Sequence, residues 1–288
     1  MMSRLTVAGC FLLFSTLLTA QAPTGRRAAQ RPDRKQLLVW CDTRYGGAYH
    51  DSVSHAMAVI EKMGRDTGLY DAYLRTDSQL ITKQKISVFA DGRDWPVNKN
   101  LNYFDGIFFF GMREIELTDQ QKADLLSFVR DDGKGFVAAH TADTAFLSWP
   151  EFGEMLGARY DGHPWNLIEA PVIVEDPAFP AMKQFPAVFT IRDEMYQAKD
   201  FSRDEIRVLL RLDTSKVDMK HPGVNRTDGD YPQAWVKKFG KGRVFVSSFG
   251  HEVQAWDNPA LQTMWLEAIK WSLGLTDAEI TPRPMPKN

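Results

Sequence analysis

Cysteine is scarce in this chain of 288 residues, which contains only Cys10 and Cys41. Cys10 lies in an N-terminal segment that we expect to be removed, so a single thiol remains in the mature protein. One thiol cannot form an internal disulfide, and the fold must therefore be stabilised by its hydrophobic core. A domain of about this length buries roughly three quarters of its unfolded surface, which is enough for that purpose.

The sequence also lacks an excess of charge of either sign, because its formal net charge is -2. A nucleic-acid-binding protein needs a basic face that neutralises phosphates, and the near balance of charges gives no sign of one. We therefore expect no nucleic-acid partner and look for a small-molecule ligand instead.

Residues 1–20 have the layout of a secretory signal peptide: a basic start, an apolar run over residues 7–18, and a small residue, Ala20, at the cleavage site. The run is too short and too close to the N-terminus for a convincing membrane span. We expect an exported protein, periplasmic or extracellular, with no stable membrane span after cleavage. The alternative is a lipoprotein anchored through Cys10, which ends a lipobox-like segment. Residues 21–35 are rich in Pro, Arg and Ala without an apolar period, which predicts a disordered leader.

Short apolar runs alternate with helical periodicity in the next hundred residues. Such alternation predicts βαβ units and a mostly parallel sheet flanked by helices. A helix is expected from Asp51 to near Gly64, and a second one after the cap residue Thr118. The expected strands are Lys35–Trp40, Tyr70–Arg75, Phe104–Phe110 and Phe136–Ala139.

Residues 171–240 contain further β-like runs, which we interpret as an extension of the sheet or as a β-rich cap. A β-hairpin follows, with its turn at residues 238–242 and its second strand at residues 242–247. The last helix is expected at about residues 259–273.

Three histidines, His50, His140 and His251, follow predicted strands. Ligands of such sheets bind beyond the carboxyl ends of the strands. His140 occupies the sharp strand-to-helix turn at which nucleophilic enzymes of this architecture carry Ser or Cys. There it can act as a general base, a metal ligand or a hydrogen-bonding clamp. Cys41 ends the first strand instead and is predicted to be a packed small residue, so amidotransfer through a cysteine is not expected.

Asp143 lies three residues after His140, on the same helical turn. Two interpretations stay open: it caps the following helix, or it orients the histidine ring or contacts a ligand.

Aromatic and acidic residues supply further candidates. His163 and Trp165 lie in the segment GHPW, where an aromatic face beside polar donors suits a sugar, although a surface turn with a packed Trp is the alternative. Glu194 follows Asp193 on a predicted strand, and strand neighbours point to opposite faces. Only one of these two carboxylates can enter a pocket with Tyr196, while the other pairs with an Arg or a backbone amide.

His251 follows Gly250, which permits a close approach to a ligand, and Trp256 lies nearby in the sequence. Zinc sites use three or four His, Cys or carboxylate ligands. The candidate ligands are His140, His163 and His251, with no tight spacing such as His-x-His, so their convergence would depend on the fold. A bound divalent metal stays an open alternative.

The order of several segments resembles that of the ThuA-like (trehalose utilisation) family, within the class I glutamine amidotransferase-like superfamily. The segments are YHDS at 49–52, YFDG at 103–106, GFVAAH at 135–140, GHP at 162–164, DExY at 193–196, GxGRV at 240–244 and GH at 250–251. The resemblance covers residues 36–275 and implies a flavodoxin-like fold without the elbow cysteine. We assign residues 36–278 to this domain and residues 279–288 to a C-terminal tail.

Two departures from the family pattern affect ligand contacts. Tyr231 stands where the family tends to have a histidine before the late Ala-Trp pair, and residues 175–180 lack a second His-Pro. A tyrosine can replace a hydrogen bond at that position but not a metal-ligating imidazole.

The resemblance implies work on a carbohydrate, such as a 3-keto-disaccharide or glycoside. The leading hypothesis is an exported enzyme that uses acid/base hydrolysis, elimination or isomerisation, with His140 or His251 as acid or base and Glu194 as their partner. A non-catalytic carbohydrate-binding protein and a metal-dependent hydrolase are the alternatives. The expected substrate-binding residues are His50, Asp143, His163, Trp165, Tyr196 and Trp256.

Overall fold

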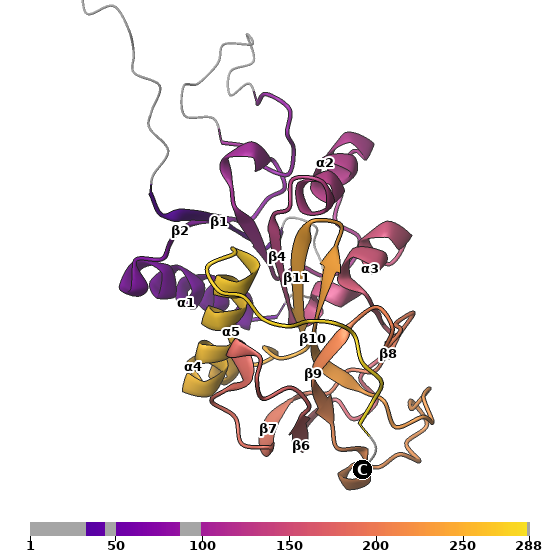
Figure 1. Ribbon diagram of the computed structural model, residues 1–288. Coiled ribbons are helices and arrows are strands. Elements are labelled where there is room, and N and C mark those ends of the chain that lie inside the picture. Colours follow the sequence, from indigo (N-terminus) through magenta and orange to yellow (C-terminus); the bar gives the residue numbers. More distant parts are fainter. Residues whose placement is uncertain (1–32, 44–49, 87–98, 287–288) are drawn as a thin grey trace, which may run out of the picture. The chain divides into compact units, whose positions relative to one another are not determined.

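The computed structural model describes residues 33–43, 50–86 and 99–286, and the predicted signal peptide lies outside these residues. Five parallel strands form one half of a nine-stranded sheet, in the order β2-β1-β3-β4-β11 (Figure 1). This is the flavodoxin-like order 2-1-3-4-5, with β11 as the fifth strand. The strands are β1 (Lys35–Trp40), β2 (Tyr70–Arg75), β3 (Gly106–Phe109), β4 (Gly135–Ala139) and β11 (Gly242–Ser247). The predicted fold class is confirmed, and β1 begins at the last residue of the predicted leader.

The remaining strands continue the same sheet in antiparallel fashion, in the order β11-β10-β9-β6-β7. The β-rich middle of the chain is therefore an extension of the sheet and not a separate cap. These strands are β6 (Leu167–Val174), β7 (Val188–Glu194), β9 (Arg207–Leu212) and β10 (Pro232–Phe239). A separate two-stranded ribbon pairs β5 (Arg159–Tyr160) with β8 (Ala198–Lys199).

Strands β1, β3, β4 and β11 of the parallel half are buried on both faces, which explains their nearly continuous apolar runs, whereas the edge strand β2 is partly exposed. Leu37 and Val39 of β1 face one core, and Leu38 and Trp40 face the other. Residues of α1 (Ser52–Thr67), α4 (Val253–Asp257) and α5 (Pro259–Ser272) pack in the first core. Residues of α2 (Asp119–Arg130) and α3 (Pro150–Leu156) pack in the second. Short 3₁₀ turns occur at η1 (Leu101–Tyr103), η2 (His140–Thr144), η3 (Pro180–Met182) and η4 (Thr214–Lys216).

Two helix ends compare directly with the prediction. Thr118 caps α2 through a reciprocal capping box with Gln121, as the sequence predicts for the cap. The first helix continues past Gly64 and ends at Gly68, whose φ of 67° is the left-handed conformation that glycine favours. Gly64 therefore lies inside the helix. The position requires glycine because a Cβ there would lie 2.5 Å from the ring of Tyr70.

A buried cluster of ion pairs connects β9 with the C-terminal residues. The Glu175 carboxylate accepts hydrogen bonds from Arg203 at 2.7 Å and pairs with Arg211 at 2.8 Å. Arg203 also donates to Asp230, and Arg283 donates to the backbone carbonyl of Glu175. The predicted C-terminal tail, as far as it is described, is thus held against the sheet.

Within the described residues, no helix is long and apolar enough to cross a membrane.

Replacing Arg203 by methionine is expected to lower the free energy of unfolding by about 3–5 kcal/mol, because two buried carboxylates would lose their shared partner. The matched control is Arg130→Met, which removes an exposed ion pair with Asp131 and should change the stability far less than Arg203→Met. Urea unfolding of the three proteins measures both values. Equal losses in the two variants would contradict a structural role for the buried cluster.

Candidate metal and active site

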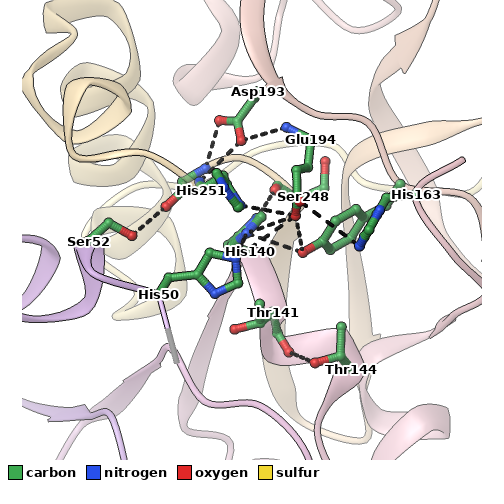
Figure 2. Close-up of polar contacts among 12 residues, drawn as sticks. His50, Ser52, His140, Thr141, Thr144, His163, Asp193, Glu194, Ser248 and His251 are labelled. Atoms are coloured by element: carbon green, nitrogen blue, oxygen red, sulfur yellow. Dashed lines mark hydrogen bonds and ion pairs between the residues drawn. The ribbon is translucent and has the colours of Figure 1, made fainter. Parts of the chain in front are cut away.

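Four side chains converge at the carboxyl ends of the strands. His50 follows β1, His140 opens η2 directly after β4, Glu194 ends β7, and His251 lies in the loop after β11. One ligand atom from each lies within 4.8 Å of those from the other three. Figure 2 shows the three rings and the carboxylate directed toward one another. The sheet thus gathers residues that are up to 201 positions apart in the sequence (251 − 50).

The ring of His140 is held in one orientation and one tautomer. Its Nδ1 lies 2.5 Å from the backbone carbonyl of Ser248, and because a carbonyl only accepts, Nδ1 carries the proton. Nε2 is therefore unprotonated and faces the cluster. Burial, with His50 as a second cause, lowers the pKa of His140 to about 3, so the ring stays neutral at physiological pH. The backbone of His140 has a φ of 47°, which turns the chain sharply at the strand end.

Glu194 is the acceptor at the centre of the cluster. Its Oε2 lies 3.1 Å from Nδ1 of His251, 3.6 Å from Nε2 of His140 and 3.9 Å from Nε2 of His50. Burial alone would raise the pKa of this carboxyl, but the contacts with His251 and His50 outweigh burial and hold the pKa well below its ordinary value. Glu194 in turn raises the pKa of His251. Without a metal ion, the cluster therefore holds an ionised carboxylate beside a readily protonated imidazole.

Asp193 does not enter the cluster but builds the loop that carries His251. Its carboxylate accepts hydrogen bonds from the backbone N–H groups of Glu194, Gly250 and His251, at 2.9–3.1 Å. This matches the expectation that one carboxylate of the pair enters the pocket while the other binds backbone amides. Gly250 has a φ of 128°, and a Cβ at this position would lie 2.8 Å from the ring of Trp256. Only glycine fits there without strain.

The donor set fits a divalent transition metal. Three imidazoles and one carboxylate are typical ligands of Zn²⁺, which prefers four donors at about 2.0–2.2 Å in a tetrahedron, about 3.4 Å apart. Nε2 of His140 lies 3.1 Å from Nε2 of His50, Oε2 of Glu194 lies 3.1–3.9 Å from a ring nitrogen of each histidine, and all four ligand atoms lie within 4.8 Å of one another. The hydrogen bond from Nδ1 of His140 to a backbone carbonyl is the outer contact that orients metal-ligating histidines.

The converging set differs from the predicted ligand candidates at three residues. His50, predicted to bind substrate, and Glu194, predicted to act as a catalytic partner, belong to the converging set. His163, predicted as a candidate ligand, is outside it: its Nε2 lies 3.9 Å from Oε1 of Glu194, and its ring is 35% exposed. The sequence could not distinguish these residues because their convergence depends on loop geometry.

A cavity of about 410 Å³ opens beside the cluster. Its lining includes His163 and Tyr196, both expected at the site. The hydroxyl of Tyr196 lies 3.2 Å from Nε2 of His140 and 3.4 Å from Oε2 of Glu194. Burial raises the pKa of Tyr196 well above its ordinary value, which keeps the phenol protonated. Sequence reasoning missed Tyr160 and Arg113, which also line this cavity. Arg113 follows the carboxyl end of β3, and that position was the available signal.

Neither tryptophan expected to stack against a sugar is placed to do so. Trp256 is fully buried, stacks on Trp265 at 5.3 Å and donates its Nε1–H to the carbonyl of Gly250. Trp165 packs against Tyr231 and donates to the carbonyl of Asp218. The expectation for Trp256 is corrected, because its ring is fully buried. Trp165 is half-buried and is not among the residues that line the cavity beside the cluster. The packed-tryptophan alternative describes Trp165 better.

Asp143 is buried, and its Oδ1 has no hydrogen-bond partner among the described residues. Among the described residues, neither η2 nor α3 has a side-chain capping hydrogen bond from Asp143, so the capping interpretation lacks support. Burial raises the pKa of Asp143 to about 8. A buried carboxyl without a partner lowers the stability of the folded protein when it ionises. Groups that cost stability in this way are common at functional sites.

Asp143→Asn is expected to raise the free energy of unfolding by about 5 kcal/mol near pH 8 and by less than about 1 kcal/mol near pH 4. The pKa of Asp143 rises from 3.8 in the unfolded chain to about 8 in the folded protein, so wild-type folding takes up a proton between these values. The wild type therefore loses stability as the pH rises through this range, and asparagine does not. Urea unfolding at both pH values measures the difference. A destabilised variant at pH 8 would show that the carboxylate has a partner.

The fold and the cluster together define the class: a flavodoxin-like α/β protein with a histidine in place of the elbow nucleophile. Cys41, the thiol of the domain, is fully buried, and burial raises its pKa to about 12, so it offers no nucleophile. The chain belongs to the ThuA family, described as trehalose utilisation, whose sequence profile matches residues 36–272.

Two crystal structures of ThuA-like proteins share the fold. The protein from Parabacteroides merdae is 16% identical, with a TM-score of 0.63 over 88% of this chain and 94% of that chain. The protein from Bacteroides uniformis is 19% identical, with a TM-score of 0.63 over 88% of this chain and 95% of that chain. At these identities the likeness establishes the fold alone. The search of the curated proteins gave no match.

Proposed function

We propose that this protein is an enzyme of carbohydrate metabolism whose reaction depends on a divalent metal ion. The observation that carries the proposal is the convergence of His50, His140, His251 and Glu194, with the unprotonated Nε2 of His140 facing the other three. A binding module for neutral sugars has no need for a buried, ionised carboxylate among three imidazoles. The family's description, trehalose utilisation, supports a carbohydrate derivative as substrate.

The proposed substrate is a 3-keto-disaccharide or a 3-keto-glycoside. An ion bound to the four residues would act as a Lewis acid if it accepted a substrate oxygen as a fifth ligand, and it would then polarise that oxygen. A carbonyl at C3 makes the proton at C2 acidic, and loss of this proton permits elimination of the glycosidic oxygen from C1. Hydrolysis and isomerisation also need one group that removes a proton and one that returns a proton. The proposal therefore covers elimination, hydrolysis and isomerisation.

The side chains outside the ligand set provide the proton transfers. His163 lines the cavity and remains available as base and acid, because its imidazole is not among the converging ligands. Tyr196 keeps its proton and donates a hydrogen bond toward His140 or Glu194, and a substrate oxygen can replace either acceptor. Asp143, which would be largely protonated below pH 8, adds a buried acid next to Tyr196.

We further propose that the protein is exported. The support is the layout of residues 1–20, with a lipid anchor at Cys10 as the alternative. An exported enzyme would meet its glycoside outside the cytoplasm. Mass spectrometry of the mature N-terminus in the periplasm or culture medium tests the proposal, and an intact Met1 in the cytoplasmic fraction would contradict it.

The activity is tested with 3-keto-trehalose as substrate and trehalose as control. The zinc-loaded protein should convert the keto sugar and leave trehalose unchanged. Removal of the metal with a chelator should abolish turnover, and stoichiometric Zn²⁺ or Mn²⁺ should restore it. Turnover that is insensitive to the chelator would contradict the metal dependence, and no turnover under any condition would contradict the substrate class.

A further inference from the structure

Arg113 lines the 410 Å³ cavity next to the cluster, and its charge is not neutralised by the protein. The guanidinium is exposed and makes no hydrogen bond or ion pair with any residue in the described part of the chain. Among the described residues that line this cavity, it is the only lysine or arginine. A cation without a partner in a ligand cavity is available for a ligand anion.

The adjacent acid, Glu114, is held elsewhere. Its carboxylate accepts hydrogen bonds from the backbone N–H and the hydroxyl of Ser148, at 2.8 Å and 2.7 Å. Both oxygens are therefore bound, and the carboxylate does not need Arg113 as a partner. The carboxylate of Glu114 thus binds Ser148 and does not pair with the neighbouring guanidinium of Arg113.

The backbone of Arg113 is fixed although its side chain is free. Its φ is 63°, a conformation that non-glycine residues rarely adopt. The strain is maintained by a β-bridge to Ala145 and by a hydrogen bond of 2.9 Å from the N–H of Phe146 to the carbonyl of Arg113. The start of the loop is held by Thr141, whose hydroxyl donates to the carbonyl of Gly111. The chain therefore presents this arginine at a defined place on the cavity wall.

Besides Arg113, the side chains of His163 and Tyr160 line the cavity and can each donate one hydrogen bond, but neither offers the paired donors of a guanidinium. The hydroxyls of Thr141 and Thr144 already donate to backbone carbonyls. Glu194 is negatively charged and would repel an anion unless a metal ion neutralised it. Met112 and Leu147 are apolar, and Leu147 is 40% exposed. An anionic group on a ligand would therefore find its strongest partner at Arg113, because a guanidinium can bind a carboxylate or phosphate with two parallel hydrogen bonds.

We infer that Arg113 is a specificity-determining residue: among the proposed keto-glycosides it favours those that also bear an oxyanion, a carboxylate or a phosphate, over neutral ones such as 3-keto-trehalose. The inference rests on the proposed function, because it names the substrate class of the same cavity. The sugar ring would lie between the polar cluster and Arg113, with its apolar face toward Met112 and Leu147.

The test compares three ligands by calorimetry on the zinc-loaded protein: methyl α-glucoside, methyl α-glucuronide and glucose 6-phosphate. At least one anionic sugar should bind about ten-fold or more tightly than the neutral glycoside. R113Q should remove this preference, and R113K should retain part of it, because a lysine keeps the charge but not the bidentate geometry. The control R65Q removes an exposed arginine of α1 that pairs with Glu61 and should leave all affinities unchanged.

Equal affinity for the neutral and anionic sugars, or a preference that survives in R113Q, would overturn the inference. If the chelator abolished the preference for anionic sugars and R113Q retained it, the anion would bind the metal ion instead of Arg113. Absence of binding by either anionic sugar at millimolar concentration would also overturn it. The proposed function fails separately, through the lack of bound metal or of keto-sugar turnover, since R113Q leaves all four proposed ligands intact.

Discussion

Glu194→Gln is expected to lower both zinc affinity and kcat/KM by at least about 100-fold, because loss of an outer contact of a metal ligand alone costs about 10–100-fold. The substitution keeps the shape of the side chain but removes the negative charge that faces three imidazoles. In the metal-free protein, it should also lower the pKa of His251, since Glu194 is the main cause of its rise. Competition with a chromophoric chelator measures the affinity, and NMR titration of the ring measures the pKa.

The matched control is Glu252→Gln, which removes a carboxylate next to His251 in the sequence. Glu252 pairs with Arg192 at 3.2 Å and is not a member of the converging set. This variant should keep its zinc affinity and its turnover within about two-fold, as is usual for an exposed ion pair. If both variants lost activity equally while both retained zinc, the carboxylate of Glu194 would not be a metal ligand.

Zinc must displace the proton of any ligand that is protonated. Below the pKa of such a ligand, the affinity for zinc is expected to fall about ten-fold for each unit by which the pH is lowered and for each proton displaced. Glu194 raises the pKa of His251, so protons compete for this ring at a higher pH than for an ordinary histidine. His140 should not contribute to the competition, because its pKa is lowered to about 3. The affinity should therefore rise with pH and level off above the pKa of His251.

Calorimetry in buffers of different ionisation enthalpy measures the protons released on zinc binding. The expected result is at least one proton per ion at a pH below the pKa of His251, and a smaller release in E194Q, in which that pKa is lower. Zinc binding that is independent of pH between about 5 and 8, around the ordinary pKa of histidine, would contradict the assignment of His251 as a ligand.

The parallel half of the fold could be predicted from the sequence because its strands are short apolar runs. The expected bounds of β1 and β2 agree with the structure. The antiparallel half was less certain, since its half-exposed strands give a weaker pattern: β7, for example, buries only Ile191, Asp193 and Glu194. Whether these strands form a cap or extend the sheet depends on pairings between residues far apart in sequence, such as Val172 with Leu212.

The candidate site could be predicted only as far as strand ends determine position. His50, His140 and His251 follow parallel strands, so their proximity follows from topology. Glu194 ends β7, which lies at the far edge of the sheet order. Hydrogen bonds from the loop after β11 to Asp193 and the ion pair of Arg192 with Glu252 connect β7 with that loop. The role expected for Trp256 was wrong because proximity to a histidine in sequence does not show whether a ring is buried. Trp165 follows His163 closely in sequence, yet it does not line the cavity that His163 lines.

Anomalous diffraction from crystals of the full chain grown with zinc tests the central claim most directly. The account predicts one strong peak at the zinc edge, about 2.0–2.3 Å from the ligand atoms of His50, His140, His251 and Glu194. It also predicts that the Nδ1–H of His140 remains bonded to the carbonyl of Ser248. A peak located elsewhere, or none at this cluster at saturating zinc, would contradict the account.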